Sequence, residues 1–213
     1  KIKRSFNKFN LKKKINIVNN FENYKKKMIN VYNTDNLKKK YSSEILNDLS
    51  HSYNLAVITK SDLVTLPINK YEVKEKINNF NGVTEFLGKL NNSKTFMIMK
   101  GDLFSIVPLT THIPLKKVSK IFLKQLNYLE ILLGYLIKNQ LEYKNIIFLG
   151  LNPHSGEDGT IGDEERILKS KIKILQKKFQ NFKFIGPLSA DSAFKNIKKN
   201  SLYISGFHDQ ALI

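Results

Sequence analysis

The sequence contains no cysteine, so disulfide bonds play no part in its stability. It also lacks a long apolar run. The most apolar stretch, residues 121–137, is interrupted by four polar residues and falls short of the roughly 18–20 apolar residues that cross a bilayer. Its first residues show no signal-peptide pattern of charge, apolar run and small-residue cleavage site. We therefore expect a cytoplasmic protein with no membrane partner.

Acidic residues and arginine are scarce. The chain has 18 acidic and 36 basic residues, which gives a formal net charge of +18. Only Arg4 and Arg166 are arginines, although arginine makes most of the bidentate contacts to bases and phosphates. The lysines occur with many asparagines and isoleucines along the whole chain, as in proteins of AT-rich genomes. A nucleic-acid-binding protein stays one hypothesis and requires lysines clustered on one face, but we expect no specific nucleic-acid partner.

The stretch Gly150–Glu165 reads GLNPHSGEDGTIGDEE and combines four glycines, a proline, a histidine and three terminal acids. It follows the apolar run Asn145–Leu149, which is typical of a buried strand, and precedes Arg166–Phe179, whose apolar residues recur at helical spacing. Ligands in α/β folds bind beyond the carboxyl ends of strands. An ordinary connection is shorter and does not need four glycines. We therefore interpret the stretch as a functional loop, whose glycines let the backbone fold tightly around His154.

Strand and helix patterns alternate over the rest of the chain, which predicts an α/β fold. At 213 residues the chain can form one domain or parts of two. The further predicted strands are Lys13–Val18, Asp62–Leu66, Thr95–Met99, Phe104–Leu109, Phe182–Ile185 and Leu202–Ser205. The further predicted helices are Tyr41–Lys60, capped by Ser42 or Ser43, Lys70–Ile77, a helix opening at Thr84-Glu85, and Lys116–Gln140.

Three histidines, His112, His154 and His208, each follow a predicted strand. The carboxyl ends of such strands can meet at one edge of a sheet, and neutral imidazole is a common ligand of zinc and related divalent ions. Asp191 and Asp209 could orient the imidazoles from behind. The alternative is three unrelated loop histidines, because the sequence contains no compact ligand pair such as HExxH. The spacing alone leaves both interpretations open.

The histidine motifs belong to a set of ordered sequence blocks, which in chain order are DLVTLPINK, GVTEFL, TTHIPL, GLNPHSGEDGTIGDEE, GPLSADSAF and HDQAL. This set resembles the 4-hydroxythreonine-4-phosphate dehydrogenase family of vitamin B6 biosynthesis. The blocks extend from about Asp62 to Leu212, whereas the first 60 residues match only loosely. We therefore describe 1–60 as the N-terminal part of a first lobe and 61–213 as the dehydrogenase-like region that carries the metal-site motifs.

The resemblance implies an isopropylmalate-dehydrogenase-like α/β/α fold in two lobes and a homodimer. It further implies that His112, His154 and His208 bind a divalent metal (Zn, Mg or Co) shared across the dimer. The implied activity is NAD- or NADP-linked oxidation and decarboxylation of 4-phosphooxy-L-threonine (4-hydroxythreonine 4-phosphate) to 3-amino-2-oxopropyl phosphate. The partner is thus a small phosphorylated amino acid. A cation beside the substrate hydroxyl favours its deprotonation and stabilises the charge that develops as carbon dioxide leaves.

The chain departs from the family pattern at three places. A His-Thr pair contacts the phosphorylated substrate in the family, and Val83-Thr84 occupies those positions here. Thr84 matches, but a valine can neither donate a hydrogen bond nor carry charge. The family's N-terminal GDPxGIG loop has no counterpart, and its C-terminal lysine, asparagine and arginine would follow Ile213. We therefore expect an incomplete fold and keep two alternatives. One is a catalytically silent metal- or phosphate-binding remnant, and the other is a dehydrogenase for a related phosphorylated hydroxy acid.

Overall fold

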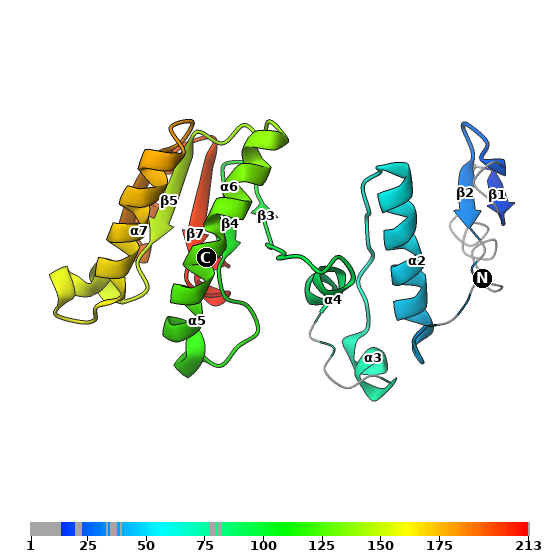
Figure 1. Cartoon of the computed structure of the whole chain (residues 1–213), viewed down its shortest axis with the longest axis horizontal. Coiled ribbons are helices and arrows are strands. Elements are labelled where there is room, and N and C mark those ends of the chain that lie inside the picture. The colour runs from blue at the N-terminus through cyan, green and yellow to red at the C-terminus, as the bar shows by residue number, and fades with distance from the viewer. Residues whose placement is uncertain are drawn as a thin grey trace. The chain divides into compact units, whose positions relative to one another are not determined.

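The computed structural model describes residues 14–19, 23–32, 34, 38, 40–76, 80 and 82–212. The chain divides into two compact units, Lys1–Gly82 and Val83–Ile213, which we treat separately (Figure 1). The predicted division between residues 60 and 61 marks where the family motifs begin in the sequence. It is a different kind of boundary from the one between compact units, and it stays a prediction. In the part of the chain that the structure describes, no helix is long and apolar enough to cross a membrane.

The described residues of the first unit form two short strands and two helices. Strands β1 (Ile15–Val18) and β2 (Ile29–Tyr32) pair in parallel, with Ile15 opposite Ile29. Helices α2 (Glu44–Thr59) and α3 (Lys70–Lys76) confirm two predicted helices. Lys13 and Ile77, at the ends of two predicted elements, lie outside the described residues.

Ser43 is the N-cap residue of α2, as expected, but its side chain makes no capping hydrogen bond. The buried Asn47 stabilises this helix start instead. Its Oδ1 accepts hydrogen bonds from the backbone N–H groups of Lys40 and Tyr41, at 2.8 Å each. The periodicity located the helix correctly but not the residue that secures its first turn.

The predicted strand Asp62–Leu66 is wrong, because residues 61–69 have no regular structure. Val64 is 88% exposed and Leu66 is 82% exposed, and none of the described strands pairs with them. A β-branched, apolar composition favours a strand only where a neighbouring strand supplies the hydrogen bonds. The local pattern therefore predicted a strand, but the described part of the chain offers no neighbouring strand to pair with it.

The second unit is built on a five-stranded sheet in the order β3-β4-β7-β5-β6. The edge strand β3 is antiparallel to β4, and the other neighbours pair in parallel. The strands are β3 (Met99–Lys100), β4 (Ser105–Pro108), β5 (Asn145–Leu149), β6 (Lys183–Leu188) and β7 (Ser201–Ser205). Only the last residue of the predicted strand Thr95–Met99 lies in β3, whereas its Phe96 and Ile98 pack on the core as irregular chain.

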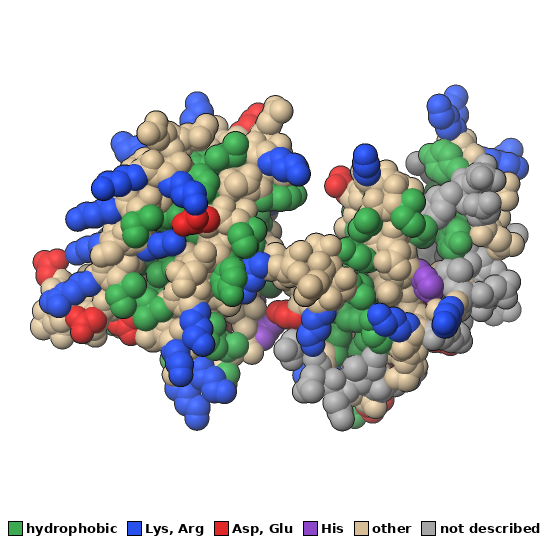
Figure 2. Space-filling model, viewed as in Figure 1, with side chains coloured by type: hydrophobic (Ala, Val, Ile, Leu, Met, Phe, Trp, Pro, Cys, Tyr) green, Lys and Arg blue, Asp and Glu red, His purple; other side chains and the backbone are tan. Residues whose placement is uncertain are grey.

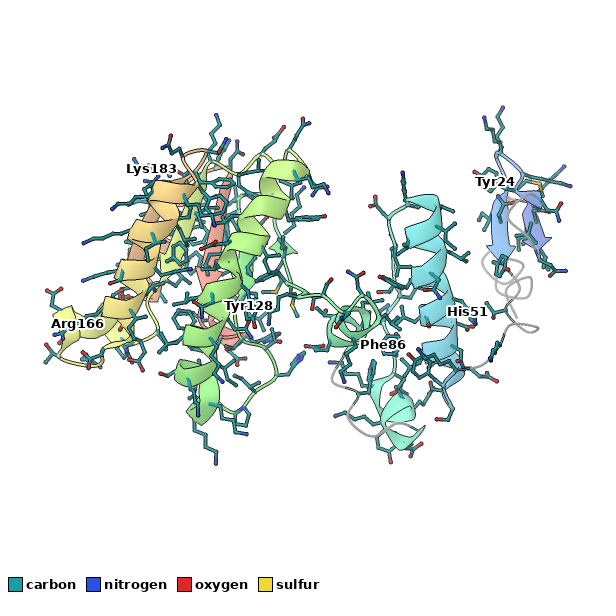
Figure 3. The ribbon with its side chains drawn as sticks, viewed as in Figure 1. Tyr24, His51, Phe86, Tyr128, Arg166 and Lys183 are labelled. Carbon is teal, nitrogen blue, oxygen red and sulfur yellow. The ribbon has the colours of Figure 1, made fainter. Side chains whose placement is uncertain are left out.

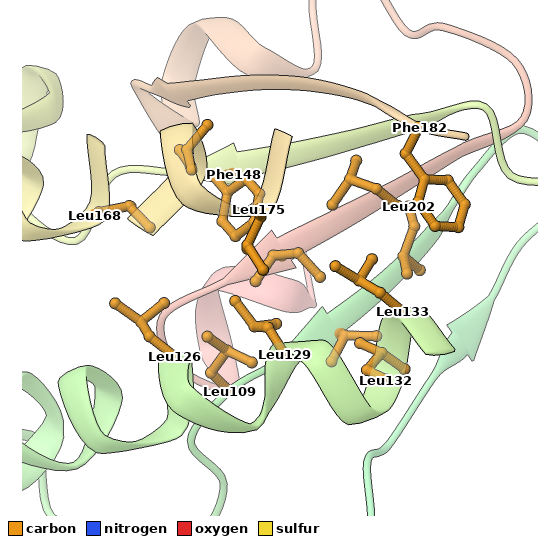
Figure 4. Packing of buried hydrophobic residues seen from close by; sticks show 14 of the residues in the cluster. Leu109, Leu126, Leu129, Leu132, Leu133, Phe148, Leu168, Leu175, Phe182 and Leu202 are labelled. Carbon is orange, nitrogen blue, oxygen red and sulfur yellow. The ribbon is translucent and has the colours of Figure 1, made fainter. Parts of the chain in front are cut away.

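Alternate side chains of the central strands enter two apolar clusters on opposite faces of the sheet, as the strand period of two requires. Phe148 and Ile204 belong to the larger cluster, which is shown in Figure 4, and Ile147 and Tyr203 belong to the smaller one. Burial on both faces is typical of parallel sheets. The larger cluster is completed by α5 (Val118–Gln125), α6 (Leu129–Lys138) and α7 (Glu164–Lys178).

The predicted single helix Lys116–Gln140 is interrupted. A 3-10 turn, η2 (Leu115–Lys117), precedes α5, and a second one, η3 (Leu126–Tyr128), separates α5 from α6. The apolar stripe is nevertheless buried as expected, from Phe122 to Leu136. A 3-10 turn and an α-helical turn both bring residues three apart close together, so the apolar spacing could not reveal the change.

Short helical segments cover the remaining connections. They are α4 (Val83–Leu90), η4 (Pro153–Gly159), α8 (Ala190–Ala193) and η5 (Asp209–Ala211). Because β4, β7 and β5 are parallel neighbours, their carboxyl ends lie at one edge of the sheet. The three motif histidines follow these ends.

Candidate metal and substrate site

A buried hydrogen-bond network joins the loops that follow β4, β7 and β5. The Thr110 hydroxyl donates to the Gly206 carbonyl at 2.7 Å. The Gln210 side chain accepts a hydrogen bond from the Gly206 N–H at 2.7 Å and donates one to the Gly150 carbonyl at 2.8 Å. These contacts fix the backbone at the base of all three histidine loops. Neither residue was predicted from the sequence, although Thr110 and Gln210 belong to the TTHIPL and HDQAL blocks.

The structure brings His112 and His208 together. Their ring centroids lie 5.4 Å apart, with 35° between the ring planes. Both line a pocket of about 420 Å³ whose wall includes Thr111, Val118 and Phe207. The backbone of His112 is left-handed, with φ at 48°, a conformation that a histidine adopts far less readily than glycine. The pairing of the two imidazoles therefore depends on a locally constrained turn.

Glu85 lies behind His112, in the first turn of α4 and two residues after Val83. Its Oε1 is 3.9 Å from His112 Nδ1 and accepts a hydrogen bond from the Thr111 hydroxyl at 3.4 Å. From the sequence, Glu85 was predicted only to lie at a helix start. The position of Glu85 directly after the Val83-Thr84 pair was the only hint of a role in the sequence. Its hydrogen-bond partner Thr111 lies 26 residues further along the chain, so local spacing could not reveal the contact.

His154 lies on a loop of unusual backbone conformation. From His154 to Asp158 every residue is left-handed, with φ between 42° and 78°. Gly156 accepts this conformation without penalty; a Cβ atom there would also lie 2.7 Å from Glu165 Oε2. The glycine therefore allows close packing of the loop against the buried Glu165.

Two acids at the start of α7 secure the same loop. Glu165 is 3% exposed and accepts hydrogen bonds from the backbone N–H groups of Leu151, at 2.8 Å, and Asn152, at 2.7 Å. Glu164 accepts hydrogen bonds from the Ser119 hydroxyl at 2.5 Å and the Asn152 amide at 2.9 Å. Arg166, labelled in Figure 3, follows them in the first turn of α7, and its Nη1 lies 3.4 Å from Asp163 Oδ1. The predicted acidic helix start thus also anchors the loop.

The two aspartates predicted to orient imidazoles lie in different surroundings. Asp209 Oδ1 is 3.9 Å from His208 Nδ1, but the Asp209 side chain is 90% exposed. Asp191 is exposed in α8, where the Ser189 hydroxyl is the main cause that holds the pKa of Asp191 below its usual value, and the charges of His154 and Lys195 contribute less. Asp209 therefore lies next to the His208 ring, and Asp191 lies close enough to His154 for the charge of one to act on the other.

His154 does not complete a metal site with the other two histidines within the described part of the chain, where no group of three His, Cys, Asp or Glu side chains is arranged to hold a metal ion. The three-histidine site stays a prediction. The donor chemistry of the His112–His208 pair nevertheless fits a divalent ion such as zinc, because two imidazoles face one pocket and carboxylates lie behind them.

Basic side chains extend over the surface of α7 and the neighbouring helices of the second unit (Figure 2). Two of these lysines form ion pairs on the surface: Glu130 of α6 lies 3.3 Å from Lys171 and 2.5 Å from Lys178 of α7. These contacts hold the pKa of Glu130 below its ordinary value, and the Lys178 hydrogen bond is the largest cause. They link the two helices that cover the larger core.

Comparison with known proteins gives concordant results. Residues 2–213 match the model of the family described as pyridoxal phosphate biosynthetic protein PdxA. A 4-hydroxythreonine-4-phosphate dehydrogenase from Hydrogenobaculum sp. is 38% identical over 154 residues, which are 71% of this chain and 48% of the relative. One from Wigglesworthia glossinidia brevipalpis is 37% identical over 178 residues, or 79% of this chain and 52% of the relative. The chain thus spans about half the length of these curated relatives.

A solved structure of a 4-hydroxythreonine-4-phosphate dehydrogenase from Burkholderia phymatum superposes with a TM-score of 0.70 at 22% identity, covering 99% of this chain and 69% of that chain. A Klebsiella pneumoniae enzyme of the same name gives a TM-score of 0.68 at 19% identity, covering 94% and 67%. These likenesses confirm the expected isopropylmalate-dehydrogenase-like α/β/α fold.

Proposed function

The chain belongs to the family of pyridoxal phosphate biosynthetic protein PdxA, and from this membership we propose that it acts in vitamin B6 biosynthesis. The proposed reaction is the metal-dependent, NAD(P)-linked oxidation and decarboxylation of 4-phosphooxy-L-threonine to 3-amino-2-oxopropyl phosphate. We place it in the cytoplasm. The observation that carries the proposal is the pocket at the carboxyl edge of the sheet, where His112 and His208 face each other.

In this proposal His112 and His208 hold a divalent metal through their imidazole nitrogens, with zinc, magnesium or cobalt as candidates. When bound, the metal supplies positive charge beside the substrate hydroxyl and carboxylate, and the nicotinamide supplies the hydride acceptor. Thr110 and Gln210 keep the two histidine loops in place through their buried hydrogen bonds. Thr84 donates its hydroxyl to the phosphorylated substrate, and Val83 leaves the neighbouring contact unmade.

We propose that His154 is the third ligand and that it comes from a second copy of the chain in a homodimer. Two observations support this arrangement. His154 is exposed on a loop that Glu165 holds in a fixed conformation. In addition, the described part of one chain does not gather all three histidines into one donor group. A loop that is rigid and exposed is well suited to deliver a ligand to another molecule.

The silent remnant and the dehydrogenase for a related hydroxy acid are the competing functions, and Val83 favours both. The discriminating experiment incubates the chain with 4-phosphooxy-L-threonine, a divalent metal, and NAD⁺ or NADP⁺, and follows reduced nicotinamide by absorbance. We expect turnover that is lost on metal chelation and in His208→Ala. No turnover with any of the three metals would contradict the proposed activity. Turnover of another phosphorylated hydroxy acid but not of this substrate would favour the related dehydrogenase.

A further inference from the structure

We propose that Glu85 is a positioning residue for His112. Its carboxylate lies beside His112 Nδ1 and favours the tautomer that carries the proton on that nitrogen, which leaves Nε2 of the same ring free for a ligand in the pocket shared with His208. The consequence for metal binding rests on the proposed function, whereas the orientation of the ring is a property of the metal-free chain. No role for Glu85 follows from the sequence motifs or from the comparisons.

The first support is the geometry around the Glu85 carboxylate. Its Oε1 is held by the Thr111 hydroxyl at 3.4 Å and lies 3.9 Å from His112 Nδ1. The Glu85 side chain is only 31% exposed, so it is partly shielded from water. A separation of 3.9 Å is longer than a formed hydrogen bond. Contacts of this kind are often long without ligand and shorten in the complex.

The second support is the constraint on His112 itself. Its left-handed backbone, with φ at 48°, fixes the direction in which the side chain leaves the loop. One edge of the imidazole then faces α4, and the ring lies against His208 in the pocket. With Nδ1 next to a carboxylate, the neutral ring carries its proton on Nδ1 and keeps the Nε2 lone pair for a ligand.

Asp209 provides an internal comparison. It also lies 3.9 Å from a histidine Nδ1, that of His208, but its side chain is 90% exposed. Solvent competes strongly for such a carboxylate, and a flexible exposed pair contributes little. The two carboxylates have the same distance to an imidazole and differ in shielding and in the support from Thr111. The proposal therefore predicts a strong effect for Glu85 and a weak one for Asp209.

The direct test measures the His112 tautomer in the metal-free, ¹⁵N-labelled full chain by NMR correlation of the ring nitrogens and carbons. We expect the Nδ1–H form in the parent and in Glu85→Gln, whose side-chain oxygen presents the same kind of acceptor to Nδ1. In Glu85→Ala we expect both tautomers, Nδ1–H and Nε2–H, in the mixture that a free neutral imidazole shows. If His112 shows the same tautomer in Glu85→Ala as in the parent, Glu85 does not position the ring.

The second test measures zinc affinity by titration of variants of the 213-residue chain. Loss of a carboxylate behind a ligating histidine typically weakens metal binding by about 10–100-fold, so we expect that range for Glu85→Ala, with partial recovery in Glu85→Gln. The matched control is Glu142→Ala, an exposed glutamate on the loop before β5, at the opposite edge of the sheet, which should bind like the parent.

His112→Ala separates the two possible failures. If His112→Ala binds zinc as tightly as the parent, the metal-site proposal is wrong whatever Glu85 does. If His112→Ala loses affinity while Glu85→Ala binds like the parent, the metal site stands and the role assigned to Glu85 is overturned. A variant that fails to fold is recognised by its lost NMR dispersion, and Glu85→Gln, which keeps the shape of the side chain, then decides the question.

Discussion

At the scale of single residues, the site depends on side chains that reach between distant parts of the chain. The sequence predicts the three histidines as candidate ligands because each follows a strand pattern within a recognisable motif, and the structure brings two of them, His112 and His208, together. Glu85, Gln210 and Glu165 were not, because their roles lie in contacts to Thr111, Gly150 and Leu151 that only the folded chain creates. Residue type and local spacing identify candidates for a ligand but not the groups that hold it.

The stability of the chain in acid tests whether Glu164 anchors the His154 loop through its hydrogen bonds to Ser119 and Asn152. The Ser119 hydroxyl, and then the Asn152 amide, hold the pKa of Glu164 below its ordinary value. Because the folded-state pKa is depressed, the stabilisation is fully present above the unfolded-state pKa, about 4.3. It is lost as the pH falls through the folded-state pKa. We expect Glu164→Gln to lower the free energy of unfolding by about 1 kcal/mol at neutral pH and to flatten its loss in acid.

Urea unfolding at neutral and acid pH measures this effect. Ser119→Ala should reproduce part of the change, and adding it to Glu164→Gln should cost little more, because the two residues share one hydrogen bond. Fully additive effects would show that the bond does not stabilise the folded chain.

A substitution at Val83 tests whether the Val83-Thr84 pair contacts the substrate. Val83→His restores the residue that the family resemblance implies, so we expect a lower KM for 4-phosphooxy-L-threonine through one added contact to the substrate, about 1.5–3 kcal/mol if it is charge-assisted. Steady-state kinetics measure the change. Val57→His, on an exposed position of α2, is the control for adding a histidine. An unchanged KM in Val83→His would place the substrate elsewhere.

At the scale of elements, the sequence patterns predicted β4, β5, β7 and α7 closely, because apolar residues recur without interruption at strand or helix spacing in each of them. They failed at Asp62–Leu66, at most of Thr95–Met99 and at the 3-10 turn within the predicted helix Lys116–Gln140. Strand formation depends on partners far along the chain, and a tight turn preserves the apolar spacing of a helix.

Strand β6 contains a bulge at Gly186, where the backbone leaves no room for a side chain. The pairing register shifts between Ile147 and Leu149 opposite this strand. Gly186 has φ at 119°, and a Cβ atom there would lie 2.4 Å from the Phe148 carbonyl oxygen. We expect Gly186→Ala to destabilise the chain by more than about 2 kcal/mol, because neither the backbone conformation nor the space allows a side chain.

Gly134→Ala is the matched control, because a Cβ atom at this position in α6 meets nothing within 4 Å. Alanine favours the helix, so we expect a gain of about 0.5–1 kcal/mol. Thermal or urea unfolding gives both values. Equal effects of the two substitutions would contradict the assigned backbone roles.

At the scale of the whole molecule, the second unit contains both apolar clusters and all three motif histidines. We therefore expect a fragment of residues 83–213 to fold alone, with a cooperative urea transition and the His112–His208 pairing intact. Circular dichroism and the NMR signals of the two rings test this. A fragment that unfolds without a cooperative transition would show that the first unit is needed for the core.

The proposal that connects these scales is a metal site assembled from two chains, with His112 and His208 on one and His154 on the other. The most direct test is a zinc titration of a co-purified heterodimer of His154→Ala and His208→Ala chains. In this heterodimer one composite site keeps all three histidines and the other loses two. The account predicts one tight zinc site per heterodimer, although each variant alone binds weakly. A heterodimer with no tight site, or a His154→Ala chain that binds zinc like the parent, would contradict it.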